Sequence, residues 1–234
     1  MIDSSTRQRI VDACSLGRER SEQDLRALMV ETCRSMNSSG LNQGKSGNLS
    51  ARLDPGVFLV TPSGMDYDSM RPDHIVRMTM QGAAHGSYAP SSEWRMHRDI
   101  LLSRPDVCAV LHAHPIRSTA LACHGRSIPA FHYMVAVAGG ADIRCAAYAT
   151  FGTQELADNA LRALEGRRAC LLEHHGMLAL GDCPRSAFEL ATEVETLAAM
   201  YLEALTLGEP PRLSNEEMSR VSRAFAGYGQ VRSL

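Results

Sequence analysis

RPDVCAVLHAHP, residues 104–115, is the stretch of sequence that decides the fold of this 234-residue chain. An apolar run begins at Val107 and ends in His112-Ala113-His114, which has the length and composition of a buried β-strand. Pro115 follows at once, and because proline is common in the first turn of a helix, a helix is predicted over 115–123. A buried strand that runs straight into a helix indicates helices layered on a sheet.

Further strands and helices extend this pattern in both directions along the chain. The predicted strands span 48–53, 57–61, 107–114, 169–173 and 176–181. The predicted helices span 21–40, 94–102, 115–123, 154–164, 184–207 and 215–225. The turn Asp54-Pro55-Gly56 makes the first two strands a hairpin, and hairpins favour a mixed sheet over an all-parallel one. The polar residues 1–20 predict an N-terminal arm, and 21–234 is predicted to be a single domain.

Composition excludes several classes of partner. Hydrophobic residues make up 44% of the chain and charged residues 21%, and the net charge is −2, so neither nucleic acid nor an anionic membrane is a predicted partner. No apolar run reaches the ~18 residues of a membrane span, and the polar N-terminal stretch is unlike a secretory signal. Seven scattered cysteines, such as Cys108 within VCAVL, indicate mostly buried reduced thiols. These features predict a cytoplasmic protein.

The pair His112 and His114 is the sharpest chemical signal. Side chains alternate along a strand, so both imidazoles are expected on the same face. A divalent ion such as Zn²⁺ would join them, although two polar residues at the end of a strand would give the same pattern. A third histidine could come from Leu171-Leu172-Glu173-His174-His175-Gly176. Because neighbouring residues of a strand face opposite ways, at most one of His174 and His175 can join His112 and His114. Three histidine ligands would leave one coordination position of the metal open, as in a catalytic site.

Small polar residues gather at three further strand or helix ends. In Pro90-Ser91-Ser92-Glu93-Trp94 the serines can cap the following helix, or the helix end can bind an anion. The segments 46–50, SGNLS, and 61–64, TPSG, offer hydroxyls and backbone N–H groups of the kind that hold phosphate. Turn formation alone explains each of these segments too, because Gly, Asn and Ser are common turn residues.

Taken together, these motifs resemble the class II aldolase/adducin family, and within it the branch that cleaves L-fuculose 1-phosphate. The resemblance runs from about Leu41 to Tyr228 and rests on LNQGKSGNLS, TPSG, PSSEWRMH, RPDVCAVLHAHP, IPAFHYM, YATFGTQEL, EHHGMLALG, EVETLAAMYLEAL and FAGYG. It implies a three-layer α/β/α fold with a central mixed, largely antiparallel sheet. It also implies a homotetramer whose active sites lie at subunit interfaces.

The resemblance also implies roles for individual residues. It places His112, His114 and His175 on one Zn²⁺ ion, which Mn²⁺ or Co²⁺ could replace. Glu93 corresponds to a carboxylate that binds the metal at rest and then serves as base, and Tyr133 to a proton donor from a neighbouring subunit. The residues that it assigns to the substrate phosphate are Gly47, Asn48, Ser63, Gly64, Ser91 and Ser92. Those that it assigns to the aldehyde pocket are Phe151, Phe225 and Tyr228.

The implied function is a zinc-dependent aldolase that reversibly cleaves a ketose 1-phosphate, similar to L-fuculose 1-phosphate, into dihydroxyacetone phosphate and a short aldehyde such as lactaldehyde. The single lysine, Lys45, lies in a loop and occupies no obvious Schiff-base position, so a metal rather than an imine is expected to accept the electrons. Lys45 also replaces a small polar residue of the family. The segment 63–67 looks more like the pentulose-phosphate 4-epimerase branch. The alternatives are that epimerase, a sugar-acid-phosphate decarboxylase, or a non-catalytic adducin-like binding module, a branch that lacks the metal ligands that this chain keeps.

Overall fold

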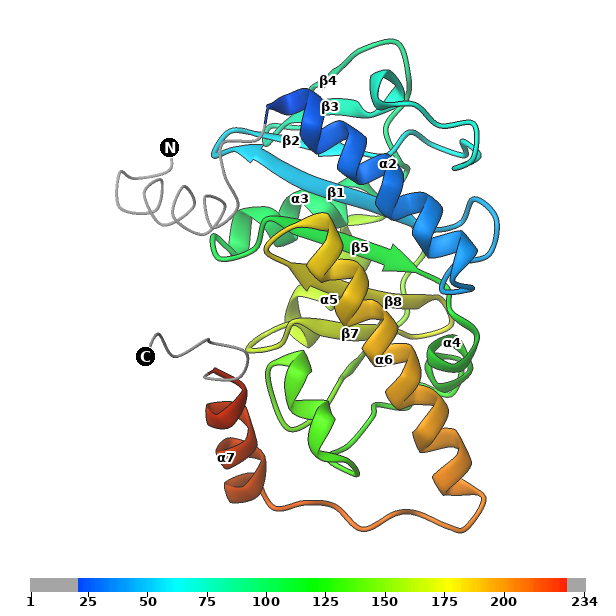
Figure 1. Cartoon of the computed structure of the whole chain (residues 1–234), viewed down its shortest axis with the longest axis vertical. Coiled ribbons are helices and arrows are strands. Elements are labelled where there is room, and N and C mark those ends of the chain that lie inside the picture. The colour runs from blue at the N-terminus through cyan, green and yellow to red at the C-terminus, as the bar shows by residue number, and fades with distance from the viewer. Residues whose placement is uncertain (1–20, 227–234) are drawn as a thin grey trace, which may run out of the picture.

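The computed structural model of the chain describes residues 21–226 (Figure 1), so the predicted arm at 1–20 and Tyr228 lie outside the described residues. Eight strands form one sheet in this part, in the spatial order β4-β3-β2-β1-β5-β8-β7-β6. Their bounds are β1 Asn48–Asp54, β2 Val57–Val60, β3 Val76–Thr79, β4 Ala84–His85, β5 Ala109–Ala113, β6 Cys145–Ala146, β7 Ala169–Leu172 and β8 Gly176–Gly181. Only β6 and β7 pair in parallel, which confirms the mixed, largely antiparallel sheet.

Helices cover both faces of this sheet. They are α2 Glu22–Ser38, α3 Trp94–Ser103, α4 Ile116–Ala122, α5 Gln154–Ala163, α6 Pro184–Leu205 and α7 Asn215–Ala226, with short 3₁₀ turns η1 Pro72–His74 and η2 Tyr133–Ala138. One buried layer joins α2, α4 and α6 to the sheet, and the other joins α3 and α5 to its opposite face. In Figure 1, α2 and α6 cross the near face of the sheet. The structure therefore has the three-layer α/β/α arrangement.

The position of β5 between two helical layers explains why its residues before His112 are all apolar. Ala109 and Leu111 pack into the layer of α2, α4 and α6, whereas Val110 packs into the layer of α3 and α5. A strand with helices on both faces has no solvent side, so the alternating pattern of a half-buried strand disappears. Its two neighbours, β1 and β8, are both antiparallel to it.

The predicted boundaries hold closely, with small corrections. Ser21 caps α2 through a reciprocal pair of hydrogen bonds with Asp24. Helix α4 begins at Ile116 rather than at residue 115, because Pro115 keeps an extended backbone and acts as its N-cap. The sequence does not predict β3, β4 and β6, since two of them have only two residues and none stands between strong turn signals. Cys108 is disulfide-bonded, so the prediction of a reduced thiol is wrong at that residue.

Arg52 fastens α3 to the sheet. Its buried guanidinium donates hydrogen bonds to the carbonyls of Leu101, Arg104 and Val107, at the C-terminal end of α3 and just before β5. Burial lowers the pKa of Arg52 to about 10, so the group stays charged at neutral pH. Arg52 therefore ties the C-terminal end of α3 to the sheet. No helix within residues 21–226 is long and apolar enough to cross a membrane.

Candidate active site

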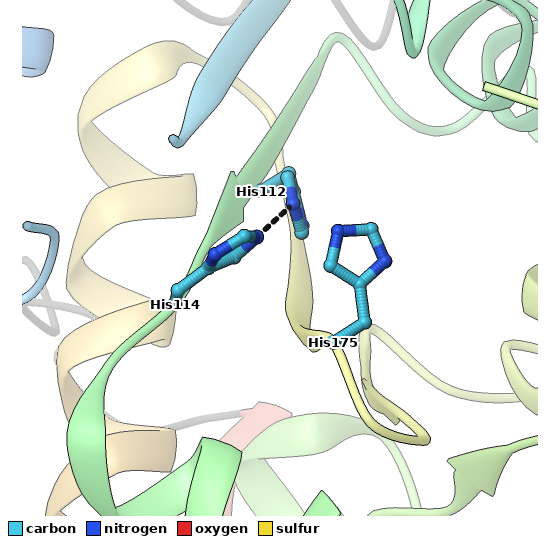
Figure 2. A group of neighbouring side chains, drawn as sticks. All are labelled: His112, His114 and His175. Atoms are coloured by element: carbon cyan, nitrogen blue, oxygen red, sulfur yellow. Dashed lines mark hydrogen bonds between the residues drawn. The ribbon is translucent and has the colours of Figure 1, made fainter. Parts of the chain in front are cut away.

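Three histidines meet where β5 ends beside the β7–β8 turn. His112 lies in β5, His114 directly after it, and His175 in the turn just before β8. Their ring centroids are 4.7 to 4.9 Å apart, and one ligand nitrogen of each lies within 4.8 Å of the others (Figure 2). The pairing of β5 with β8, which sets Ala113 opposite Met177, brings the two chain segments together.

Hydrogen bonding and burial leave these rings neutral. His112 Nδ1 donates a hydrogen bond of 2.9 Å to the carbonyl of Met177, so its Nε2 is free of a proton and faces His114 Nε2 at 2.9 Å. Burial lowers the pKa of His112 from the ordinary 6.5 to about 4. Burial, followed by the nearby His112, lowers the pKa of His114 and of His175 to about 4 as well. Neutral imidazoles that converge in this way are the form that binds a divalent cation.

The turn selects His175 over His174. His174 has a left-handed backbone with φ of 53°, is exposed, and has its ring edge-on to Tyr148. His175 turns inward to the other two rings. Gly176 follows because a Cβ there would lie 2.5 Å from the carbonyl oxygen of Ala113 and 2.7 Å from the ring of His114. The His-Gly sequence thus lets the turn pack directly against the end of β5.

Glu93 brings a buried carboxylate to the same point. It is the N-cap residue of α3, but its side chain makes no capping hydrogen bond. Instead Oε2 lies 3.2 Å from His112 Nε2 and Oε1 lies 3.5 Å from His175 Nε2. Ser91 performs the local turn role, because its hydroxyl accepts the backbone N–H of Glu93 at 3.3 Å. The carboxylate is therefore directed at the three histidines rather than at the helix end.

A pocket of about 380 Å³ opens beside this cluster. It is lined by most of the residues that the sequence singled out: Gly47, Asn48, Ser63, Gly64, Ser91, Ser92, Glu93, His114, Phe151 and His175. Lys45 and Tyr148 line it as well. Two hydrogen bonds hold its polar loops together, from Ser63 N–H to the Ala89 carbonyl and from Ser91 N–H to the Thr61 carbonyl. A larger groove of about 1000 Å³ beside Arg126 and Tyr201 contains none of these residues.

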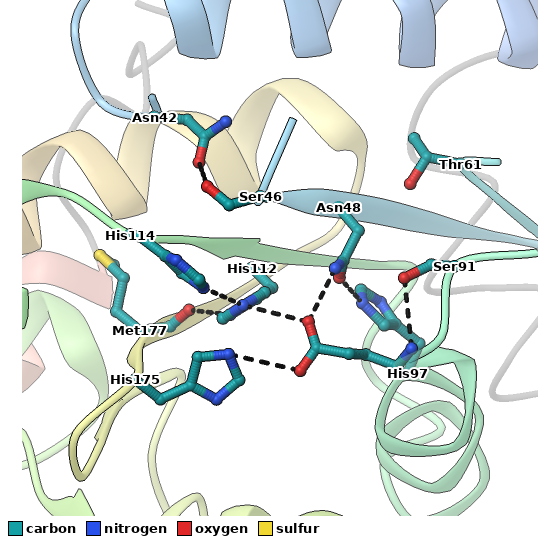
Figure 3. Close-up of polar contacts among 12 residues, drawn as sticks. Asn42, Ser46, Asn48, Thr61, Ser91, His97, His112, His114, His175 and Met177 are labelled. Atoms are coloured by element: carbon teal, nitrogen blue, oxygen red, sulfur yellow. Dashed lines mark hydrogen bonds and ion pairs between the residues drawn. The ribbon is translucent and has the colours of Figure 1, made fainter. Parts of the chain in front are cut away.

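Two predicted site residues lie elsewhere in the described chain. Tyr133, in η2, is 49% exposed and stacks on Phe225 of α7, and neither residue lines the pocket. His97, a buried histidine that none of the sequence motifs marks as functional, stands behind the pocket. It contacts Asn48, which in turn donates a hydrogen bond of 2.9 Å to Glu93 Oε2 (Figure 3). The sequence feature that could have identified His97 is its position one helical turn after Glu93 in PSSEWRMH.

Comparison with known proteins gives a consistent result. Residues 27–202 match the family described as "Class II Aldolase and Adducin N-terminal domain". A 5-methylthioribulose-1-phosphate/5-deoxyribulose-1-phosphate aldolase of Rhodospirillum rubrum is 53% identical over 210 residues, covering 90% of this chain and 95% of that protein. An L-fuculose phosphate aldolase of Escherichia coli K12 is 46% identical over 202 residues, covering 86% and 94%. A solved structure of an L-fuculose 1-phosphate aldolase superposes with a TM-score of 0.85 at 40% identity, covering 90% and 100%.

Proposed function

Because this chain belongs to the class II aldolase and adducin family and is a lyase of the aldolase type, we propose that it cleaves a ketose 1-phosphate into dihydroxyacetone phosphate and a short aldehyde. The observation that carries the proposal is the buried carboxylate of Glu93 within 3.2 and 3.5 Å of two of three clustered histidines. A binding module would have no use for such a cluster at the bottom of a pocket lined with hydroxyl groups.

The three histidines fit a divalent metal ion. Each presents a neutral nitrogen to a common centre, and the described residues place no cationic side chain among them. Three imidazoles beside a carboxylate suit Zn²⁺, with Mn²⁺ and Co²⁺ as the competing ions. Such an ion would supply Lewis acidity at the ketone and hydroxyl oxygens of the substrate.

Groups of the protein itself take the substrate proton and bind the phosphate. In the direction of bond formation, Glu93 takes a proton from C3, the hydroxymethyl carbon, of dihydroxyacetone phosphate, and the electron pair stays on the substrate as an enediolate. The phosphate binds at the loops of Gly47, Ser63 and Gly64 and at the hydroxyls of Ser91 and Ser92, with Lys45 at the edge of the same pocket. Asn48 lines the same pocket and belongs to this site, and its amide also donates to Glu93.

A second subunit completes the site in this proposal. Tyr133 protonates the aldehyde oxygen as the carbon–carbon bond forms, and it comes from a neighbour in a four-fold tetramer. The support is that Tyr133 is exposed and does not line the pocket of its own chain.

For the substrate, 5-deoxypentulose 1-phosphates are the first candidates. The relative with the 53% identity is named for 5-methylthioribulose 1-phosphate and 5-deoxyribulose 1-phosphate, and the rings of Tyr148 and Phe151 give the pocket an apolar side for a methyl or methylthio tail. L-fuculose 1-phosphate is the second candidate, supported by the relative at 46% identity and by the solved structure.

A substrate panel tests the proposal directly. The zinc-loaded protein is offered the three ketose 1-phosphates, with ribulose 5-phosphate and a sugar-acid phosphate as controls for epimerase and decarboxylase activity. We expect release of dihydroxyacetone phosphate with the highest kcat/KM for a 5-deoxypentulose 1-phosphate. Turnover of a control compound without any aldol cleavage would contradict the proposal.

A further inference from the structure

A short chain of buried polar groups stands behind the catalytic carboxylate. Asn48 and Ser50 are two residues apart on β1 and therefore point to the same face of the sheet, while Leu49 packs on the opposite face. Glu93 and His97 are one helical turn apart at the start of α3, which covers the face that Asn48 and Ser50 reach. The two pairs meet at a site where Ser50 and His97 are fully buried.

Each hydrogen bond along this chain has a defined donor and acceptor, and Figure 3 shows the contact between Asn48 and His97 at its centre. The Asn48 amide donates from Nδ2 to Glu93 Oε2 at 2.9 Å, so its oxygen faces His97 Nε2. An amide oxygen only accepts, so His97 carries its proton on Nε2. Its Nδ1 is then bare and accepts the hydroxyl proton of Ser50 at 2.8 Å. Turning the amide over would set two acceptors, Asn48 Oδ1 and Glu93 Oε2, against each other.

The two oxygens of Glu93 consequently differ. Oε2 accepts from Asn48, whereas Oε1 is buried and has no hydrogen-bond donor among the described residues. Oε1 lies on the His175 side of the carboxylate, 3.5 Å from His175 Nε2. A buried acceptor left without a donor is unusual in a folded protein and needs an explanation.

We propose that His97 is a positioning residue for the base: acting through Asn48, it holds Glu93 Oε2 in place so that Oε1 is the oxygen that receives the substrate proton. The inference rests on the proposed function. In the step that it assists, the C3–H bond of dihydroxyacetone phosphate breaks, an O–H bond forms at Oε1, and the electron pair remains on the substrate as the enediolate. His97 itself touches neither substrate nor metal ligand.

The competing interpretation is that His97 only satisfies polar groups in the core. Burial lowers the pKa of His97 to about 3, which agrees with a permanently neutral ring under either interpretation. The two interpretations differ in what a substitution changes. A core residue affects stability, whereas a positioning residue affects proton transfer separately from substrate affinity.

Two amide substitutions form a matched test. In His97→Gln the side-chain amide reaches the place of Nε2 and can still donate to Asn48. In His97→Asn the amide reaches only the place of Nδ1, beside Ser50. Both zinc-loaded variants are given dihydroxyacetone phosphate alone in D₂O, and solvent exchange of the C3 proton is followed by NMR, together with zinc content and melting temperature.

We expect His97→Asn to slow exchange about 10- to 100-fold, the usual scale for a misplaced catalytic group, with KM within about twofold of wild type. His97→Gln should restore most of the rate at a similar melting temperature. Equal exchange in both variants, whether fast or slow, would overturn the proposal.

If neither variant folds, the isosteric Asn48→Asp, which loses the donor to Oε2, should slow exchange at least as much, and a wild-type rate would overturn the proposal. Wild-type protein that exchanges no C3 proton would instead contradict the proposed function.

Discussion

The ring of Tyr133 stacks on the ring of Phe225 with 6.3 Å between centroids, which joins η2 to α7 at a distance from the pocket that holds Glu93. The two aromatic residues proposed for the aldehyde end of the reaction thus occur together. In the proposed tetramer, both residues would reach the active site from the same neighbouring subunit. The tyrosine that does line the pocket within the same chain is Tyr148.

Replacing Tyr133 by Phe should separate the two halves of the reaction. Aldol cleavage should fall strongly, because the acid for the aldehyde oxygen is lost, while C3 proton exchange into dihydroxyacetone phosphate continues through Glu93. Mixing Tyr133→Phe subunits with Glu93→Gln subunits should restore part of the activity, since a mixed interface can hold one intact site. Tyr148→Phe is the control. If Tyr148→Phe separates the two activities and mixing restores nothing, the acid belongs to the same chain.

Metal binding should depend on His175 and not on its neighbour. His175→Ala removes one of three converging nitrogens and should lose zinc, as measured by elemental analysis after dialysis. His174→Ala should retain zinc, because that side chain is exposed and turned toward Tyr148. Chelation should abolish activity in both the wild type and His174→Ala, and added Zn²⁺ should restore it. Full activity in protein shown to be free of metal would contradict the assignment.

Glu93→Gln should lower turnover by about 10²–10⁴, the usual contribution of a positioned base, because the amide keeps the shape of the side chain but cannot take a proton. Proton exchange into dihydroxyacetone phosphate should fall by the same factor. Glu155→Gln, an exposed change at the start of α5, is the matched control. Undiminished exchange in a folded, zinc-loaded Glu93→Gln protein would show that another group is the base.

Ser92→Ala should raise KM more than it lowers kcat, because a hydroxyl that binds phosphate does so in the ground state and the transition state alike. The exposed Ser38→Ala, at the end of α2, should change neither constant. The unphosphorylated ketose should bind more weakly than the phosphate ester to wild-type protein. Equal affinity for the two would mean that this end of the pocket binds something else.

The metal-free protein should lose stability as pH falls from about 6.5 to about 4. In the unfolded chain a histidine binds its proton near pH 6.5, whereas His112, His114 and His175 have their folded pKa values lowered to about 4. The unfolded state therefore binds more protons in this window, so the free energy of unfolding falls as the pH falls, by at most about 1.4 kcal/mol per pH unit for each histidine. His175→Gln should reduce the slope of the unfolding free energy by about one proton, as denaturant melts at several pH values would measure. His124→Gln, at an exposed histidine outside the cluster, is the matched control.

Local signals explain which parts of the fold could be predicted. The hairpin of β1 and β2 has a strong turn at Asp54-Pro55-Gly56, and the long α6 has a clear period, so the sequence predicts both within a few residues. β6 has only two residues and owes its existence to the edge of β7, which no local pattern reports.

The site residues also divide into those that a local sequence pattern marks and those that it does not. His112 and His114 are visible in the sequence as a spaced pair, and the glycine after His175 marks the turn. His97 escapes notice because a single histidine among Met96, Ile100 and Leu101 on an amphipathic helix looks like part of the core. Its partner Asn48 is distant in sequence and adjacent only once the sheet has formed.

The pairing of β5 with both its neighbours has a consequence for how the protein reaches its native state. His112 is opposite Asn48 on one side and Leu178 on the other. A slip of one residue in either pairing would turn His112 into the layer of α6 and put Leu111 or Ala113 in its place. Only the native alignment assembles three nitrogens around one point, so a divalent ion present during synthesis would stabilise that alignment and no other. If the three histidines bind such an ion, metal depletion would lower the yield of correctly paired protein as well as its activity.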